Sequence, residues 1–247
     1  MANPLHQFEI HPLVSLPLVG GYDLSFTNAS LFMMGAVLVT FLFMMLPFRH
    51  RHEVPTRFQA LAELYYRFVA DLTRDTAGSD ARPFFPFIFS LFSFVLLGNM
   101  LGMLPFSFTF TSHIIVTFVM AIFIFVMVTV VGFVRHGTHF FTLFVPEGLP
   151  DHPLSKILLV PLIFVIEFFS YLIRPITLSV RLGANMMAGH IMLKLVVGFV
   201  GVAGLWGIAP FLLSFAIIGF EFFVAVLQAY IFTLMTCVYL KDALHLH

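Results

Sequence analysis

Charged residues are what this sequence has least of. Asp, Glu, Lys and Arg make up only 10% of its 247 residues, whereas 60% are hydrophobic and the mean hydropathy is +1.04. A water-soluble fold of this size covers its surface with polar side chains, and this chain has too few of them. We therefore expect lipid to surround most of its surface, which makes the chain an integral membrane protein.

Further absences narrow the possible functions. The formal net charge is zero, and no clustered basic face indicates nucleic-acid binding. The single cysteine, Cys237, cannot form an internal disulfide. Residues 1–30 contain no Lys or Arg, so the basic start of a secretory signal is missing and we expect the mature chain to begin near Met1. The 34 Phe residues are interpreted as lipid-facing or packing side chains, and neither a cofactor nor a metal ion is expected.

Long apolar runs predict five membrane-embedded helices. A helix needs about 20 mostly apolar residues to cross the hydrocarbon of a bilayer. The predicted helices are residues 31–48, 84–104, 114–134, 156–200 and 210–240, after an outer-side N-terminal segment at 1–30. The predicted fold class is all-α, with all the helices in one membrane domain.

Residues 56–75 have a different pattern. Hydrophobic side chains recur there at helical spacing, and polar side chains occupy the other side of the same helix. The hydrophobic set is Phe58, Leu61, Tyr65, Phe68 and Leu72, and the polar set is Gln59, Glu63, Arg67, Asp71 and Arg74. Such an amphipathic helix is expected to lie on the membrane surface and not to span it.

The last two predicted helices are longer than a membrane crossing requires. At about 1.5 Å per residue, residues 156–200 would reach roughly 68 Å, about twice the bilayer core. This helix has to tilt steeply, bend or do both, and Pro175 is the expected kink. The helix at 210–240 is also long, so the two are expected to pack as a tilted hairpin. Before them, the Gly- and Pro-rich residues 135–155 are expected to form an ordered loop.

Basic residues outside the hydrophobic runs all fall on one side of this topology. With five embedded helices, the connecting segments alternate between two sides, and one side holds Arg49, Arg51, Arg57, Arg67, Arg74, Arg82, Arg135, Lys156 and Lys241. By the positive-inside rule that side is the cytoplasm or its equivalent. The predicted N-terminus is therefore outside and the C-terminus inside.

Three basic residues, Arg174, Arg181 and Lys194, lie inside the predicted helix at 156–200. A charge at the bilayer centre costs about 2.5–3.5 kcal/mol even on lenient scales, so its retention usually marks a functional path or a buried partner. Arg181 is the most central, and its apolar flanks leave no nearby interface for its side chain to reach. Its guanidinium needs a negative partner, which can belong to another chain, since Glu167 is about four turns away.

Polar side chains form two tracks on these long helices. At about 100° per residue, the first track is one stripe of Glu167, Arg174, Arg181 and Asn185. His190 points to the opposite side, and Glu221 and Gln228 share a face of the final helix. The structural alternatives are an interfacial ion pair for Glu167 and Arg174, snorkelling for Lys194, and hydrogen bonds that merely join helices for His190, Glu221 and Asn99.

Motifs across the membrane portion resemble the family of F-type ATP synthase subunit a. The central motif is RLGANMMAGH, preceded by RPITLSV, with Arg181, Leu182, Asn185, Met186, Ala188 and Gly189 in the family's pattern. The resemblance extends to Glu167 and Ser170, to Glu221 and Gln228 with the following AYIFTLMTCVYL, and to LLGNMLGMLP around Asn99.

Two places depart from the family's pattern. Many bacterial members have the acid where this chain has His190 and the histidine where it has Glu221. The exchange keeps both chemical types within reach of each other, which suggests a preserved proton relay. Gly183 and Ala184 replace a commoner Phe-Gly, a change that concerns local packing.

The resemblance implies the stationary proton-translocating subunit of a rotary ATP synthase, which itself hydrolyses nothing. Arg181 would face the carboxylates of a rotating c-subunit ring, and b-type peripheral stalk subunits and the rest of the synthase would be further partners. The implied inlet half-channel from the outer side is lined by His190, Glu221, Asn185, Gln228 and Asn99, and the outlet half-channel toward the cytoplasm by Glu167 and Ser170. The implied location is the bacterial inner membrane, with the mitochondrial inner membrane as the alternative.

Other classes of membrane protein compete with this interpretation. A proton-coupled secondary transporter also places charges at mid-membrane, but the second half of the sequence does not repeat the first, as that class commonly does. A self-contained ion channel would need its own counter-charge for Arg181, and the sequence shows no obvious one. A purely structural scaffold would not explain the two polar tracks.

Overall fold

The structure is a computed structural model that describes residues 10–14, 25–48, 56–104, 108–144, 153–202 and 207–245. Its main helices are α1 (Asn28–Phe48), α2 (Arg57–Ala77), α3 (Phe85–Gly102), α4 (Ile114–His136), α5 (Pro153–Val202) and α6 (Ile208–Leu244). Short 3-10 helices connect them at η2 (Ser79–Phe84), η3 (Phe110–Ser112) and η4 (Gly137–Phe144). The short strands β1 (Pro12–Val14) and β2 (Phe26–Thr27) pair antiparallel before α1.

Five segments of the described chain are long and apolar enough to cross a membrane, which confirms the predicted all-α membrane fold. They contain α1, α3, α4, α5 and α6, whereas α2 is not among them. Part of the region predicted as a loop at 135–155 is helical, because α4 continues to His136 and η4 follows it. Residues 145–152 of that loop, and Arg49 and Arg51 of the orientation argument, lie outside the described residues.

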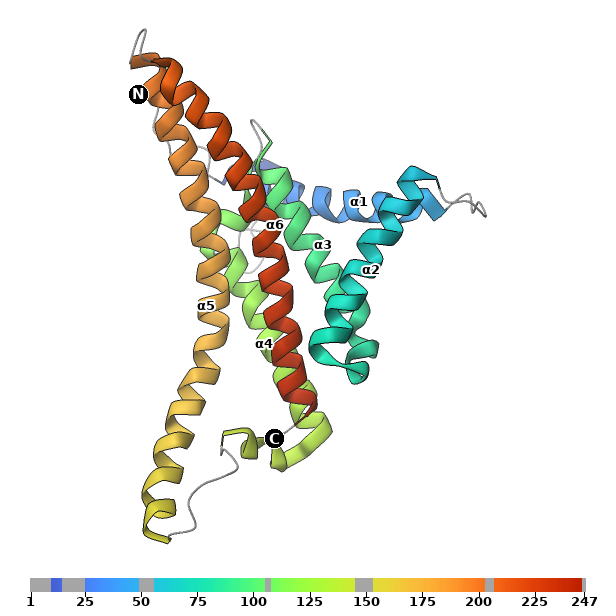
Figure 1. The fold of residues 1–247 in the computed structure, drawn as a ribbon, viewed down its shortest axis with the longest axis vertical. Coiled ribbons are helices and arrows are strands. Elements are labelled where there is room, and N and C mark those ends of the chain that lie inside the picture. Colours follow the sequence, from blue (N-terminus) through green and yellow to red (C-terminus); the bar gives the residue numbers. More distant parts are fainter. Residues whose placement is uncertain are drawn as a thin grey trace.

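The two longest helices, α5 and α6, pack beside each other as a hairpin along the long axis of the molecule (Figure 1). They have 50 and 37 residues, well above the about 20 that a perpendicular crossing needs. Helix α5 remains helical through Pro161 and Pro175. Because α1 runs across the direction of α5 and α6 in Figure 1, these helices cannot all stand upright in one bilayer.

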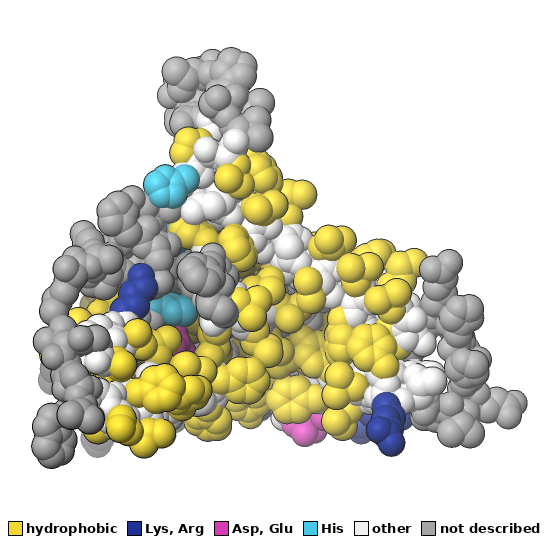
Figure 2. Space-filling model, turned by 90° about the horizontal axis from the view of Figure 1, so that it is seen from above, with side chains coloured by type: hydrophobic (Ala, Val, Ile, Leu, Met, Phe, Trp, Pro, Cys, Tyr) yellow, Lys and Arg dark blue, Asp and Glu magenta, His cyan; other side chains and the backbone are white. Residues whose placement is uncertain are grey.

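The buried core combines alanines with large hydrophobic side chains, and many further large hydrophobic side chains are exposed on the surface. The main core joins α2 through α6 and includes Ala77, Ala81, Ala121 and Ala229, each with at most 1% of its surface exposed. On the face drawn in Figure 2, hydrophobic side chains dominate and charged ones are few. An apolar surface suits a lipid environment, because lipid tails are as apolar as the core, and the small residues of the core let helices approach closely.

Helix α2 packs against the bundle through a different face from the one its hydrophobic pattern predicts. Gln59, predicted on the polar side, is buried, whereas Phe58 and Leu61 are exposed. The buried positions carry small or medium side chains such as Ala62 and Val69, which allow α2 to lie close to its neighbours. Of the predicted apolar stripe, Phe58, Leu61 and Phe68 are exposed and left for the surrounding lipid, whereas Leu72 is buried and Tyr65 packs against the core.

A buried hydrogen bond fixes α2 against α3. The phenol of Tyr65 donates to Ser93 Oγ over 2.8 Å, and the same Ser93 hydroxyl donates to the carbonyl of Phe89. Burial raises the pKa of Tyr65 to about 12, so the phenol stays neutral and keeps its proton for this bond.

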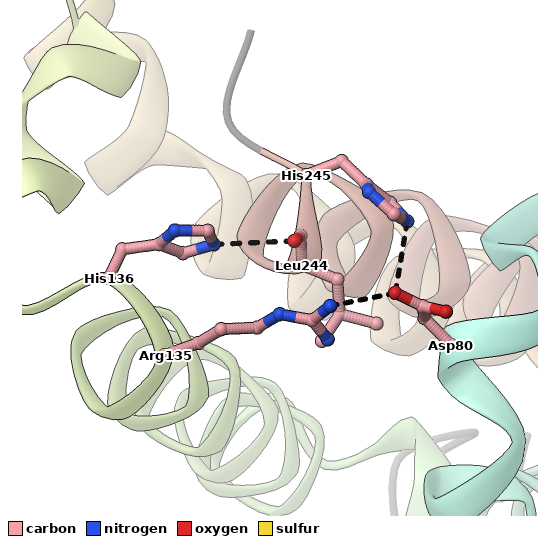
Figure 3. Close-up of polar contacts among 5 residues, drawn as sticks. All are labelled: Asp80, Arg135, His136, Leu244 and His245. Atoms are coloured by element: carbon pink, nitrogen blue, oxygen red, sulfur yellow. Dashed lines mark hydrogen bonds and ion pairs between the residues drawn. The ribbon is translucent and has the colours of Figure 1, made fainter.

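Polar contacts gather the ends of three elements at one end of the bundle (Figure 3). Arg135 at the end of α4 donates to Asp80 Oδ2 of η2 over 2.7 Å, and His245 Nε2 after α6 lies 3.8 Å from the same oxygen. His136 Nε2 donates to the carbonyl of Leu244 over 3.3 Å. These contacts hold the C-terminal end of α6 against η2 and α4. The distribution of basic residues predicts that this end of the bundle is the cytoplasmic one.

Glycines allow the connecting segments to lie directly on the helices. A Cβ at Gly98 of α3 would be only 2.5 Å from Cζ of Phe110 in η3, and a Cβ at Gly132 of α4 would be 2.4 Å from the Phe140 ring of η4. Both phenylalanine rings are buried, so neither can move aside without disturbing its neighbours.

We expect Gly98→Ala to lower the stability of the protein by about 1–3 kcal/mol, because the new methyl group overpacks the contact with Phe110. Gly35→Ala on α1 is the matched control, since a Cβ there meets nothing within 4 Å. Thermal unfolding in detergent measures the difference. Equal midpoints for the two variants would contradict the close contact between Gly98 and Phe110.

Candidate functional site: a buried His–Glu pair beside an exposed arginine

The most buried ionisable pair of the long hairpin is His190 of α5 with Glu221 of α6. His190 Nδ1 lies 3.2 Å from Glu221 Oε1, and the residues are 8% and 5% exposed. The contact is close but is not aligned as a hydrogen bond. Gly189 makes the approach possible, because a Cβ there would lie 3.1 Å from the same carboxylate oxygen.

The other ring nitrogen of His190 is held by Thr109, just before η3. Thr109 Oγ1 lies 3.0 Å from His190 Nε2 and 3.0 Å from the carbonyl oxygen of Gly102. A carbonyl can only accept, and a hydroxyl has one proton. Both contacts are satisfied when Thr109 donates to Gly102 and accepts from Nε2–H of His190. We infer that His190 carries its fixed proton on Nε2.

This tautomer leaves Nδ1 of His190 facing the carboxylate of Glu221. Without a further proton, both atoms would be acceptors at 3.2 Å, which is unfavourable. One proton relieves this, either as a neutral carboxylic acid beside a neutral imidazole or as a carboxylate beside an imidazolium. The two residues can therefore hold one proton as a unit and release it to a neighbour, as a relay requires.

Amides extend the polar track along α6 and α3. Asn185 Nδ2 donates to Gln228 Oε1 over 3.1 Å, which joins α5 to α6, and Asn99 Nδ2 donates to the carbonyl of Ala225 over 3.2 Å, which joins α3 to α6. The structure thus pairs four of the five residues predicted for the inlet, His190 with Glu221 and Asn185 with Gln228, whereas Asn99 bonds to the backbone of α6. Of the hydrogen bonds considered as the structural alternative, that of Asn99 is present and joins α3 to α6, whereas His190 and Glu221 make a close contact of 3.2 Å that is not aligned as one.

Several polar atoms of this track have no hydrogen-bond partner among the described residues. They include Asn99 Oδ1, Glu221 Oε1 and Gln228 Nε2, all buried. An unpaired buried donor or acceptor is costly, and buried water usually satisfies such groups. We therefore expect water molecules along this face of α6, which would connect the groups into a chain for proton transfer.

A cleft between α5 and α6 leads outward from the buried pair. It has a volume of about 610 Å³, and Glu221 and Asn185 are both among its lining residues. Small side chains such as Ala188 and Ala216 create the space, and Gly189 lies beside the carboxylate. The cleft therefore runs from the acid to the exposed edge of α5, one helical turn from Arg181.

Arg181 itself is exposed on the surface of α5. No carboxylate of the described part of the chain lies within 4 Å of its guanidinium, so the charge is not neutralised there by an ion pair. Its predicted companion Glu167 is also exposed, two helical turns beyond Arg174. A permanently charged group in this apolar surface calls for a negative partner outside these residues.

The second arginine of the stripe is satisfied within the chain. Arg174 Nη1 donates to Asp242 Oδ2 of α6 over 3.0 Å, and its guanidinium carbon lies 5.3 Å and 4.8 Å from the ring centroids of Tyr171 and Tyr239. The ion pair considered for Arg174 and Glu167 is therefore made with Asp242 instead. Asp242 lies 68 residues from Arg174 in sequence, so helical spacing could not reveal it.

The residues predicted for the outlet lie on the open side of α5. Glu167 and Ser170 are both exposed, and Ser170 lines an open groove of about 580 Å³ together with Arg174 and Thr177. Figure 1 shows the N-terminal end of α5 standing away from α4 and α6, and the helix meets them at Tyr171, which contacts Thr129 of α4, and at Arg174, which contacts Asp242 of α6. The structure does not bring Glu167 and Ser170 together with the His190–Glu221 pair.

Sequence reasoning missed two polar residues on the side of the pair that faces η3. Thr109 contacts His190 although 81 residues separate them. His113 stacks on Phe108 with ring centroids 5.1 Å apart, and burial lowers its pKa, so the ring is neutral near pH 7. The only sequence signal is a run of hydroxyl residues between Ser107 and His113, which does not specify a contact. No group of three metal-ligating side chains occurs among the described residues.

Comparisons with a family profile and with individual known proteins point to the same family. A family profile described as ATP synthase A chain matches residues 30–241. A protein named ATP synthase subunit a from Parvibaculum lavamentivorans is 52% identical over 250 residues, which cover 98% of this chain and 94% of the relative. Proteins of the same name from Pelagibacter ubique and Paramagnetospirillum magneticum are 52% and 50% identical, covering 99% and 100% of this chain and 98% and 100% of the relatives.

We expect ¹⁵N spectra of histidine-labelled protein to show the Nε2–H tautomer at His190. Thr109→Val removes the hydroxyl between His190 and Gly102 and should give a mixture of tautomers, whereas Thr109→Ser keeps the hydroxyl and should preserve the single form. A single Nδ1–H tautomer in the wild type would contradict the inferred hydrogen-bond direction.

Proposed function

The chain belongs to the ATP synthase subunit a family, and on that premise we propose that it is the stationary proton-translocating subunit of an F-type ATP synthase. We place it in the inner membrane of a bacterium, as a multi-pass protein with a periplasmic N-terminus and a cytoplasmic C-terminus. The curated relatives named above come from bacteria, and the one-sided distribution of basic residues supports the orientation.

The single observation that supports the mechanism best is the cleft beside the buried His190–Glu221 pair. This cleft extends along α5 to within one helical turn of Arg181. Glu221 and Asn185 line it, whereas His190 is not among its lining residues. A proton that reaches the pair from the side of Thr109 would thus leave through the cleft beside Glu221. The buried amides of Asn99 and Gln228, with water, extend the same path.

Arg181 would act on the acceptor of that proton. A c-subunit ring that carries one carboxylate per subunit would turn against the exposed face of α5. The positive charge of Arg181 favours the ionised carboxylate as it passes, so the carboxylate releases its proton on one side and takes up another on the other side. The same charge blocks a direct proton leak between the two half-channels.

The outlet toward the cytoplasm would run along the open groove of α5. Glu167 and Ser170 are exposed on this side, so the neighbouring ring would complete the path. A membrane potential of 100 mV supplies about 2.3 kcal/mol per charge moved, and two offset half-channels convert this energy into rotation in one direction. The chain would catalyse no hydrolysis itself, and b-type stalk subunits would hold it against the torque.

We expect Arg181→Ala to abolish ATP-driven acidification of inverted vesicles that carry the intact complex, because no other charge would control the ring carboxylate. Arg67→Ala is the matched control: Arg67 lies on α2 with 74% of its side chain exposed and should be neutral for pumping. Co-purification of the ring and the catalytic sector must show equal assembly. Normal pumping by an assembled Arg181→Ala complex would overturn the mechanism.

Glu221→Gln should slow proton translocation by about 10²-fold or more, because the amide keeps the shape of the side chain but cannot take up and release the proton. Ser214→Ala is the control on the same buried face of α6, since that hydroxyl only donates to the carbonyl of Phe211. Rates come from pH-sensitive dyes in vesicles. If Glu221→Gln and Ser214→Ala pumped equally fast, Glu221 would have a structural role only.

A further inference from the structure

A second pocket lies far from the proton path, where α2, η2 and the start of α3 meet. It has a volume of about 560 Å³, within the range of about 300–1,000 Å³ typical of ligand pockets. Two arginines line it, Arg74 from the last turn of α2 and Arg82 from η2, and none of the lining residues is acidic. The mechanism proposed above uses neither of them.

Neither arginine is neutralised by the part of the chain that the structure describes. No carboxylate there lies within 4 Å of Arg74 or Arg82. The nearby Asp80 is committed to Arg135, at 2.7 Å. Two unpaired guanidinium groups beside one pocket form a site for an anion with several oxygen atoms, such as a phosphate group, which arginine binds with parallel hydrogen bonds.

The opposite side of this pocket is aromatic. Tyr66 packs edge-on against Phe85 with ring centroids 5.0 Å apart, and it also contacts Phe89 one turn further along α3, at 5.9 Å. Because α3 enters the predicted span here, this aromatic strip leads from the two charges toward the hydrocarbon. The pocket therefore matches a molecule with an anionic head and an apolar tail.

We propose that this pocket binds the headgroup of an anionic phospholipid from the cytoplasmic leaflet. The phosphate would lie between Arg74 and Arg82, and an acyl chain would follow Tyr66, Phe85 and Phe89. Basic pockets beside transmembrane helices on the cytoplasmic side are suited to such headgroups. A soluble phosphate compound would use the same two arginines but would gain nothing from the aromatic strip. The bound lipid would join the surface helix α2 to the bundle.

The test uses the intact complex in nanodiscs with photoactivatable phospholipids. A phosphatidylglycerol probe should label the peptides around Arg74 and Phe85, and a phosphatidylcholine probe should label them much less. At about 1 kcal/mol per basic residue near an anionic surface, each single change to Gln should weaken apparent binding about fivefold, and the pair Arg74→Gln with Arg82→Gln about thirtyfold.

Matched variants separate a specific site from general attraction. Arg57→Gln with Arg67→Gln removes the same charge from α2 outside the pocket and should leave labelling unchanged, and Arg74→Lys with Arg82→Lys should retain most of it. Equal labelling of the double Gln variant and the wild type would overturn the proposal. So would equal labelling by both lipids, displacement by soluble glycerol 3-phosphate, or a pocket that another subunit covers in the complex. None of these results depends on proton translocation.

Discussion

The cost of an uncompensated charge in hydrocarbon governs how this protein arranges its polar side chains. The charge of Arg174 is compensated within the chain, by Asp242 and by two tyrosine rings. His190 and Glu221 face each other in the core, where one shared proton leaves the pair without a net charge. Arg181 has neither arrangement among the described residues, so its exposed charge calls for a negative partner outside them.

Small side chains serve packing and chemistry at the same places. Gly189 of α5 leaves room for the side chain of Glu221 to reach His190, and Ala188 and Ala216 line the cleft that opens beside them. A larger residue at any of these positions would close the path or separate the pair. The close approach of helices that membrane packing favours is thus also what positions the proton-carrying groups.

The sequence predicts features that depend on a single helix, but it does not predict contacts between residues that are far apart in the chain. Apolar runs predicted the membrane-spanning helices because such runs are typical of contact with lipid. Helical spacing predicted that Arg181 and His190 lie on different faces, because both residues belong to α5. Spacing could not show that Asp242 neutralises Arg174, nor that Thr109 reaches His190 across 81 residues. Gln59 was misplaced because exposed hydrophobic side chains of α2 face lipid, so hydrophobicity alone does not identify its buried face.

The two predicted half-channels differ in how much of each lies within this chain, and the proposed mechanism depends on that difference. The inlet residues are mostly buried and make polar contacts between helices, whereas Glu167 and Ser170 are exposed on the open side of α5. A chain that enclosed both paths and joined them would pass protons without moving anything. When one path ends at an exposed edge beside Arg181, a proton can cross only on a carrier that moves past that edge. In the proposed mechanism, the open groove would therefore be the surface where proton flow drives rotation.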